Sequence, residues 1–281
     1  MVASCPVDTA GHDNRPLRED DPLPPLSLEG HMKKEDLAAP RPTDEAIARL
    51  RSTLHLSTPL IALYDTAPSP DFEPLVEPKG TDCCFSYFAR WLNGETLVVR
   101  RGGPGCPGGH RGLGLENTSP PFMAHFLTDG VGAPAAEGLR ATPEIAQAIL
   151  DQKRPVPNQS GHVLVGPLRA DKWDAVRSVT FFASPDHLAA VTTLAGYWSG
   201  DKDIVAAPFG SACSSLMSAL GEYGEDDHPI LGGLDLAMRR HIPEDMLTLS
   251  VSPARFAKML TFPEESFMYK SWWNELARVR Q

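Results

Sequence analysis

Short apolar runs alternate with helical patterns from Thr43 onward, and this alternation limits the fold more than any other feature of the sequence. Apolar runs predict strands at residues 60–64, 96–100, 163–168, 179–183, 204–207 and 246–251. Helical spacing predicts helices at residues 43–54, 85–92, 184–198, 211–220, 253–260 and 265–279, with a further helix that begins at Thr142–Pro143. The alternation predicts an α/β fold: a mixed sheet flanked by helices, in one globular domain over residues 43–281.

Residues 1–42 differ from the rest of the chain because they carry no apolar period. Seven of the 27 prolines of the chain fall in this segment, together with many charged residues. Such a composition buries too little apolar surface to offset the entropy lost on ordering. We predict an extended N-terminal arm, flexible or laid as a strap on a partner subunit. Trp272 and Trp273 in the last helix are the other candidate interface of a homo-oligomer.

The charge balance excludes several classes of partner. The chain has 26 Lys and Arg against 36 Asp and Glu, a net charge of -10. We expect no nucleic-acid partner and no anionic membrane surface, because both need a basic patch. The sequence predicts no transmembrane helix and no secretory signal. Five cysteines are too few and too irregular for a disulfide scaffold, so we predict a cytoplasmic protein.

Residues 102–114 form the most unusual local sequence, because seven of these thirteen residues are glycine. Glycine lets a backbone approach a bulky group closely and point amide N–H groups at an anion. The segment matches neither a dinucleotide fingerprint nor a phosphate loop. Its centre, Cys106 followed by Pro107, is a step common where a thiolate binds an iron–sulfur cluster. The alternative is a surface turn with an inert thiol.

The other cysteines have different sequence contexts. Cys213 lies early in the predicted helix 211–220, where a helix N-terminus lowers the pKa of a thiol, but it also falls on an apolar face that suits core packing. Cys83 and Cys84 are adjacent, which strains a bond between them. Cys84 enters an aromatic segment, so one of the pair is a candidate ligand and the other a core residue. Cys5 lies in the proline-rich arm and is interpreted as a bystander.

Several sequence blocks, taken in order, resemble one protein family. The blocks are Cys83-Cys84-Phe85, Cys106-Pro107-Gly108-Gly109, Gly166-Pro167-Leu168, Ser184-Pro185-Asp186-His187, Ala212-Cys213 and Leu231-Gly232-Gly233-Leu234-Asp235, then Arg239 and Pro243-Glu244-Asp245. Over residues 48–260 the chain resembles the uncharacterised family called domain of unknown function 169. The resemblance implies no settled activity.

The resemblance does imply which cysteines act together. Cys84, Cys106 and Cys213 fall on the cysteine positions of the family, which leaves Cys83 as a bystander. Many members carry a fourth cysteine in the Leu-Gly block, where this sequence has Asp235. Three thiolates with a carboxylate or water would leave one iron of a [4Fe–4S] cluster exchangeable, and such an iron is a Lewis acid for a substrate. The alternative role for Asp235 is a helix N-cap.

His110 and Arg111 follow Cys106 closely and are the candidate catalytic residues. Histidine can shuttle a proton, and arginine can hold a substrate carboxylate through two hydrogen bonds. The alternatives are a histidine in a turn and a surface ion pair. Further positive charge near the site is expected if four other arginines face it: Arg100, Arg101, Arg239 and Arg240.

The leading hypothesis is an iron–sulfur enzyme with one [4Fe–4S] cluster on Cys84, Cys106 and Cys213 and with Asp235 on the fourth iron. It would reduce a small organic anion, with an electron donor protein as partner, or eliminate a group from it. Three alternatives stay open. One is zinc or another single metal on the same thiols with Asp235 or His110. The second is a metal-free binding module with a glycine-rich anion loop, and the third is haem on His110 or a cysteine.

Overall fold

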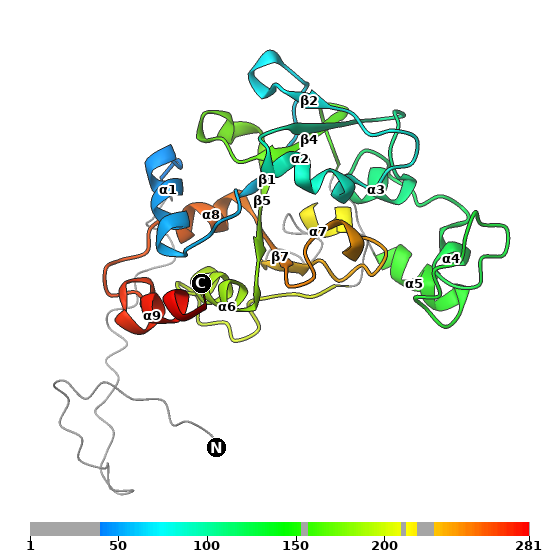
Figure 1. Ribbon diagram of the computed structural model, residues 1–281. Coiled ribbons are helices and arrows are strands. Elements are labelled where there is room, and N and C mark those ends of the chain that lie inside the picture. Colours follow the sequence, from blue (N-terminus) through cyan, green and yellow to red (C-terminus); the bar gives the residue numbers. More distant parts are fainter. Residues whose placement is uncertain (1–39, 153–156, 209–211, 218–227, 281) are drawn as a thin grey trace, which may run out of the picture. The chain divides into compact units, whose positions relative to one another are not determined.

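A seven-stranded mixed sheet carries the fold, in the strand order β2-β3-β4-β1-β5-β7-β6 (Figure 1). The computed structural model describes residues 40–152, 157–208, 212–217 and 228–280. The strands are β1 Ile61–Tyr64, β2 Leu75–Val76, β3 Thr96–Arg100, β4 His162–Pro167, β5 Val176–Ala183, β6 Ile230–Gly232 and β7 Leu247–Val251. The pair β2–β3 is parallel and the other neighbouring pairs are antiparallel.

Both faces of the sheet are buried, which explains why the strands read as continuous apolar runs. All four residues of β1 are buried. Ala62 and Tyr64 pack into one hydrophobic cluster, whereas Ile61 and Leu63 pack into another on the opposite face. Successive side chains of a strand point to opposite faces, so a sheet covered on both sides needs apolar residues at every position.

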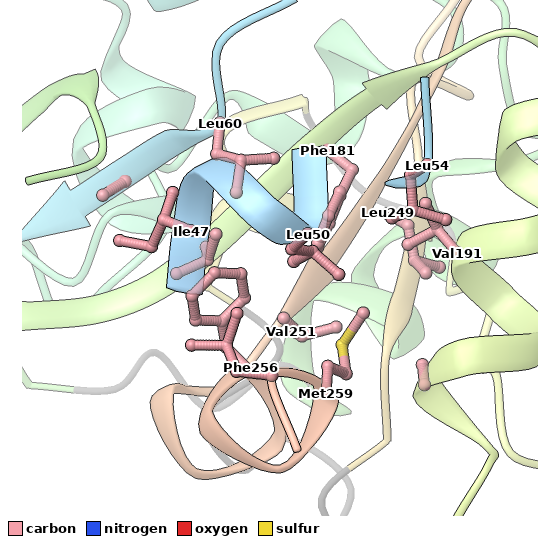
Figure 2. Close-up of a cluster of buried hydrophobic side chains, with 14 of the residues drawn as sticks. Ile47, Leu50, Leu54, Leu60, Phe181, Val191, Leu249, Val251, Phe256 and Met259 are labelled. Carbon is pink, nitrogen blue, oxygen red and sulfur yellow. The ribbon is translucent and has the colours of Figure 1, made fainter. Parts of the chain in front are cut away.

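The first face is covered by helices that contribute to one large core (Figure 2). These helices are α1 Asp44–Thr53, α6 Pro185–Ala195, α8 Pro253–Met259 and α9 Ser271–Arg280. Helix α1 begins at an N-cap residue, Thr43, whose side chain accepts a hydrogen bond from Ala46 N. Its buried Leu50 meets Phe181 of β5 and Phe256 of α8 in the same core.

The second face carries the cysteines. It is covered by the 3-10 helix η3 Cys84–Tyr87 and by α2 Phe88–Leu92, α3 Pro107–Gly112 and α7 Ala212–Met217. Phe85 and Trp91 pack edge to face with ring centroids 5.7 Å apart, and both contact Phe182 of β5. Helices α4 Met123–Phe126 and α5 Pro143–Gln152 form a separate small apolar cluster with Leu139. The remaining 3-10 helices are η2 Pro70–Phe72, η4 Ala170–Ala175, η6 Arg239–His241 and η7 Phe267–Tyr269.

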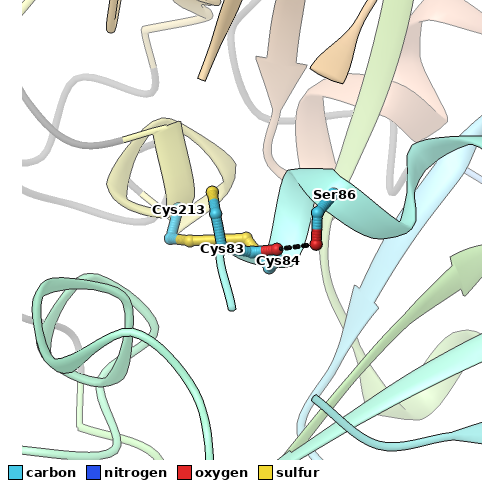
Figure 3. Close-up of a disulfide and its surroundings, with 4 residues drawn as sticks. All are labelled: Cys83, Cys84, Ser86 and Cys213. Atoms are coloured by element: carbon cyan, nitrogen blue, oxygen red, sulfur yellow. Dashed lines mark hydrogen bonds between the residues drawn. A yellow bond between two sulfur atoms is a disulfide. The ribbon is translucent and has the colours of Figure 1, made fainter. Parts of the chain in front are cut away.

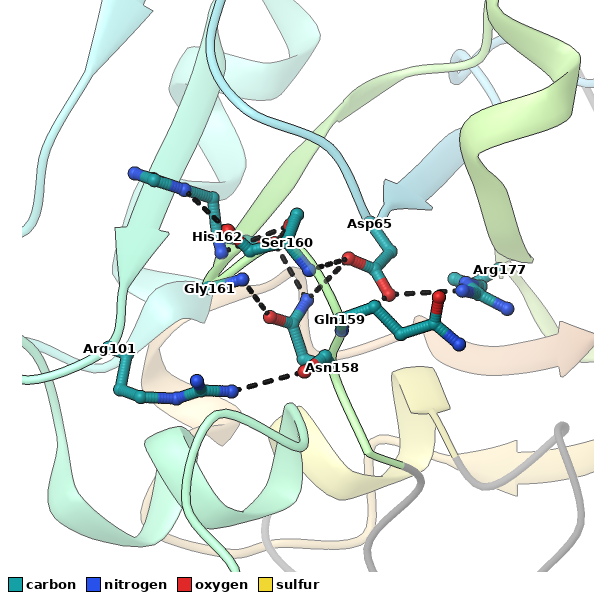
Figure 4. Close-up of polar contacts among 8 residues, drawn as sticks. All are labelled: Asp65, Arg101, Asn158, Gln159, Ser160, Gly161, His162 and Arg177. Atoms are coloured by element: carbon teal, nitrogen blue, oxygen red, sulfur yellow. Dashed lines mark hydrogen bonds and ion pairs between the residues drawn. The ribbon is translucent and has the colours of Figure 1, made fainter.

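Asp65, directly after β1, joins the ends of several strands through its carboxylate (Figure 4). The carboxylate accepts hydrogen bonds from Asn158 Nδ2 at 2.9 Å, Gln159 N at 3.1 Å and Ser160 N at 3.0 Å. Arg177 of β5 pairs with it at 3.0 Å, and the Asp65 side chain is only 5% exposed. The segment before β4 is therefore held to β1 and β5 by one buried charge.

The predicted α/β class, a single mixed sheet flanked by helices, is confirmed. The predicted strand at residues 204–207 is wrong, because Ala206 makes only an isolated bridge to Ile230. The predicted helix at 265–279 is two elements, η7 and α9, because the Ser266 side chain caps a new turn at Met268 N. Strands β2 and β6 and helix α4 were not predicted, and neither was α3, which lies inside the glycine-rich segment.

Two expectations fall outside what the structure describes. Residues 1–39, which make up most of the predicted arm, and Gly221, the predicted end of the helix 211–220, are not among the described residues. The division of the chain at residues 42 and 43 therefore stays a prediction. Within the described ranges, no helix is both long enough and apolar enough to cross a membrane.

Candidate metal centre

Cysteines from two separate segments meet on the second face of the sheet (Figure 3). Cys83 and Cys84 stand at the start of η3, and Cys213 is the second residue of α7. The sulfur atoms of these three cysteines lie within 4.8 Å of one another. The Cys84 and Cys213 sulfurs lie at disulfide distance, whereas Cys83 is a free thiol. The three cysteines are close enough to hold a metal ion.

Cys106 approaches the same group from the glycine-rich segment. It is the N-cap residue of α3, and Pro107 occupies the first helical turn, where its missing N–H costs nothing. Two backbone hydrogen bonds tie this segment to the residues before Cys83: Cys106 N donates to Asp82 O at 3.1 Å and Gly105 N donates to Gly80 O at 2.7 Å. The chain that carries Cys106 is thus fastened beside the chain that carries Cys83.

Gly109 explains why α3 and α7 can pack closely. A Cβ atom at this position would lie 3.2 Å from Cys213 Sγ and 3.5 Å from Cys106 Cβ. The side of α3 that faces α7 therefore has no room for a side chain. Of the glycines in residues 102–114, this one keeps Cys106 and Cys213 near each other.

Gly232 of β6 seats the helix that carries Cys213. A Cβ atom there would lie 2.4 Å from Ser215 Oγ of α7 and 2.5 Å from Thr248 Oγ1 of β7. Ser178 Oγ of β5 also donates a hydrogen bond to Leu216 O of α7. The Leu-Gly block of the sequence is therefore a packing feature that positions α7 on the sheet.

We expect Gly232→Ala to destabilise the protein by about 1–3 kcal/mol, because the added methyl group overpacks the contact between β6 and α7. Urea unfolding of the purified variant measures this change. Gly200→Ala is the matched control, since a Cβ at Gly200 meets nothing within 4 Å. An unchanged unfolding midpoint for Gly232→Ala would contradict the assigned packing.

A cavity of about 430 Å³ opens beside the cysteines. Cys83 and Cys106 line it together with Arg111 and Asp235. Cys84 and Cys213 are 4% and 3% exposed and border, with Cys106 and His110, a small recess next to the cavity. A metal at the sulfurs would thus be shielded on one side and accessible to a small molecule on the other.

Burial and nearby negative groups disfavour charge on the acids and thiols of the cavity. Burial, together with the neighbouring Cys106 and Asp235, raises the pKa of the Cys83 thiol to about 11. Burial and the charge of Asp235 also raise the pKa of Glu137. A cation bound among these groups would favour their charged forms, since metal binding releases protons from its ligands.

The predicted site residues lie around the cavity and its recess, but His110 does not line the main cavity. Cys84, Cys106, Cys213, Asp235 and Arg111 border the cavity or its recess, and Arg111 Nη2 donates to Leu150 O at 2.8 Å. His110 is buried beside the sulfurs rather than in the main cavity, with Nε2 3.3 Å from Pro104 O. His110 and Arg111 therefore occupy different parts of the site.

Of the four additional arginines, one lines the cavity and three bind other groups of the protein. Arg100 pairs with Glu77 at 2.7 Å, and Arg101 donates to the carbonyl oxygens of Leu115 and Asn158. The Arg239 guanidinium donates to backbone carbonyls of residues 243–246. Arg240 lines the cavity. The expected positive charge at the site thus comes from Arg111 and Arg240.

Two features were missed from the sequence. Cys83 was interpreted as a bystander, yet its sulfur lies within 4.8 Å of those of Cys84 and Cys213. The backbone at the start of η3 brings the side chains of both Cys83 and Cys84 near Cys213. The residue types alone do not reveal this arrangement. Glu137 and the apolar wall near it were also missed, because residues 116–142 carry no helical or strand period.

A family comparison agrees with the resemblance found in the sequence. The model of the family described as "uncharacterised ArCR", domain of unknown function 169, matches residues 49–261. The chain belongs to this family. No curated protein and no solved structure matches the chain significantly. Membership of domain of unknown function 169 thus supplies a framework for the cysteines but no activity.

Proposed function

We propose that this chain is an iron–sulfur protein that binds one [4Fe–4S] cluster through Cys84, Cys106 and Cys213, with Asp235 on the fourth iron. One observation carries the proposal: these four residues come from separate segments and border one cavity with its recess. Cys106-Pro107 supports it, because this step suits a cluster ligand. The family has no settled activity, so the chemistry is argued from these residues alone.

The donor set suits a cluster with one replaceable ligand when Cys84 and Cys213, whose sulfurs lie at disulfide distance, are reduced to thiolates. Cys84 and Cys213 are buried and shield their side of the centre from water, whereas Cys106 and Asp235 are half-buried at the cavity. One Asp235 oxygen accepts a hydrogen bond from Ala237 N at 3.0 Å, which orients the carboxylate. When bound, the cluster would supply a Lewis-acidic or redox-active iron.

The residues around the centre would handle a small anionic substrate. Arg111 and Arg240 in the cavity wall would attract and orient an anion, and His110 beside the sulfurs would hold or move a proton. Reduction or elimination are the reaction classes proposed. Reduction needs electrons, so an electron donor protein would be the partner if the reaction is a reduction. Thiolate ligands need a reducing compartment, which fits the cytoplasm.

Anaerobic purification from iron-replete cells tests the cluster. We expect a brown protein with broad visible absorption and about four iron and four acid-labile sulfide atoms per chain. Iron, zinc and sulfide analysis on the same sample makes the measurement quantitative. A colourless protein without iron and sulfide overturns the proposal.

A second candidate, a single zinc ion, is favoured by one specific observation. The sulfurs of Cys83, Cys84 and Cys213 lie within 4.8 Å of one another. Thiolates on one tetrahedral zinc ion lie about 3.8 Å apart, because the Zn–S bond is about 2.3 Å. Zinc without acid-labile sulfide in the purified protein would establish this candidate instead. The two candidates share Cys84 and Cys213 but differ in the use of Cys83 and Cys106.

A further inference from the structure

The cavity beside the cysteines has two unlike walls. One wall is apolar and comes from α4, α5 and the segment between them: Met123, Phe126, Leu127, Leu139, Ile149 and Leu150. All of these residues except Ile149 belong to the small α4–α5 cluster, which is separate from the cores on the two sheet faces. A polar wall comes from the segment after β6 and carries Asp235, Arg240 and His241. An occupant of this cavity needs an apolar body and a polar group.

On the polar wall, Arg240 is the group that suits an anionic ligand. Arg240 is exposed to the cavity, and its Nε lies 3.3 Å from His241 Nε2. Asp82 accepts hydrogen bonds from Tyr87 Oη at 3.0 Å and from the backbone N of residue 79 at 3.3 Å. Asp235 accepts one from the backbone N of residue 237. The contact with His241 uses one of the five N–H donors of the Arg240 guanidinium, and the guanidinium can bind an anionic ligand through others.

Glu137 is the remaining acid of the cavity wall. Burial and Asp235 raise its pKa, so it takes up a proton more readily than an exposed glutamate does. A protonated carboxyl group can donate a hydrogen bond to an incoming anion. Glu137 thus opposes an anionic ligand less than its formal charge suggests.

We propose that this cavity binds a monocarboxylic acid with an apolar body, held by Arg240 at the carboxylate and by the α4–α5 wall along the body. The inference deepens the proposed function, on which it rests for the chemistry, because it names the substrate class of the same site. An arginine fork suits a carboxylate through two parallel hydrogen bonds. A cavity of about 430 Å³ lies in the size range of small-molecule sites.

Isothermal titration of the protein as purified, with acetate, butyrate, hexanoate and octanoate as probes, tests this proposal. We expect affinity to rise about threefold to fourfold for each methylene group buried. Hexanol and hexylamine share the apolar body of hexanoate but lack its carboxylate, so we expect both to bind at least about tenfold more weakly. Equal affinity for acetate and hexanoate, or tighter binding of hexylamine, overturns the proposal.

Two arginine variants separate the carboxylate contact from general charge. We expect Arg240→Gln to weaken hexanoate binding about tenfold or more and to leave hexanol binding unchanged. Arg278→Gln, on exposed α9 at the other face of the sheet, is the matched control and should bind hexanoate as the wild type does. Equal weakening in both variants overturns the assignment of Arg240.

Metal and sulfide analysis of the same preparations keeps the two proposals apart. Hexanoate binding by a metal-free protein supports the cavity assignment and overturns the cluster. A cluster-loaded protein that binds none of the alkanoates supports the cluster and overturns the substrate class.

Discussion

Cys106→Ser is expected to remove nearly all iron and acid-labile sulfide from the protein, whereas Cys83→Ser keeps both close to wild-type values. The reason is the proposed ligand set, in which Cys106 binds the cluster and Cys83 does not. Serine is close to cysteine in size but is a poorer ligand for iron and zinc, which prefer soft thiolates. Iron, zinc and sulfide per chain, measured after anaerobic purification, give the result.

The opposite pattern identifies the zinc candidate. If one zinc ion binds Cys83, Cys84 and Cys213, Cys83→Ser loses the metal and Cys106→Ser keeps it. Cys5→Ser is the control variant, because Cys5 lies in the predicted arm, outside the proposed ligand set. Full cluster content in Cys106→Ser contradicts the proposed iron–sulfur site.

Asp65→Ala is expected to lower the free energy of unfolding by about 1–3 kcal/mol, because water can replace only part of the lost hydrogen bonds at the partly exposed donors. The substitution leaves the backbone N–H groups of Gln159 and Ser160 and the Arg177 guanidinium without their buried acceptor. Urea unfolding at neutral pH measures the loss. Asp174→Ala is the matched control, because Asp174 pairs with Arg41 at an exposed position, where ion pairs contribute about 0–1 kcal/mol.

The contribution of Asp65 also depends on pH. Burial alone raises the pKa of Asp65, but hydrogen bonds from Gln159 and Ser160 and the charge of Arg177 outweigh it and hold the pKa below its ordinary value. The stabilisation is therefore complete above the unfolded-state pKa of about 3.9 and is lost as the pH falls through the lower folded-state pKa. The difference in unfolding free energy between wild type and Asp65→Asn should narrow below about pH 4. A constant difference down to pH 2 contradicts this assignment.

Strand positions were predictable because each central strand is buried on both faces. The segments that became β1, β3, β4, β5 and β7 are mostly apolar, and an apolar run can be recognised without knowing which strands lie beside it. Residues 204–207 have the same composition but form only one bridge. An apolar segment becomes a strand of a sheet only if the edge of another strand is free to pair with it. Local composition does not show whether such an edge is present. Strand β2 has two residues, too few for any pattern.

The candidate centre was predictable in part. Cys106-Pro107 drew attention through local chemistry, and the family resemblance linked it to Cys84 and Cys213. The position of Cys83 depends on the turn of η3, and the seating of α7 depends on the contact of Gly232 with Ser215. Both are tertiary effects. The apolar wall of the cavity is built from short helices that pack against each other rather than against the sheet.

The spread of the cysteines along the chain sets an order of events during synthesis. Cys84 and Cys213 are 129 residues apart, and Cys106 lies between them in sequence. At about 5–20 residues per second, a ribosome delivers Cys213 roughly 6–26 seconds after Cys84. Strand β7, on which α7 packs, arrives later still. The nascent chain thus presents its earlier thiols before their last partner exists, and a cluster bound by all three proposed cysteines would be completed only after Cys213 has been synthesised.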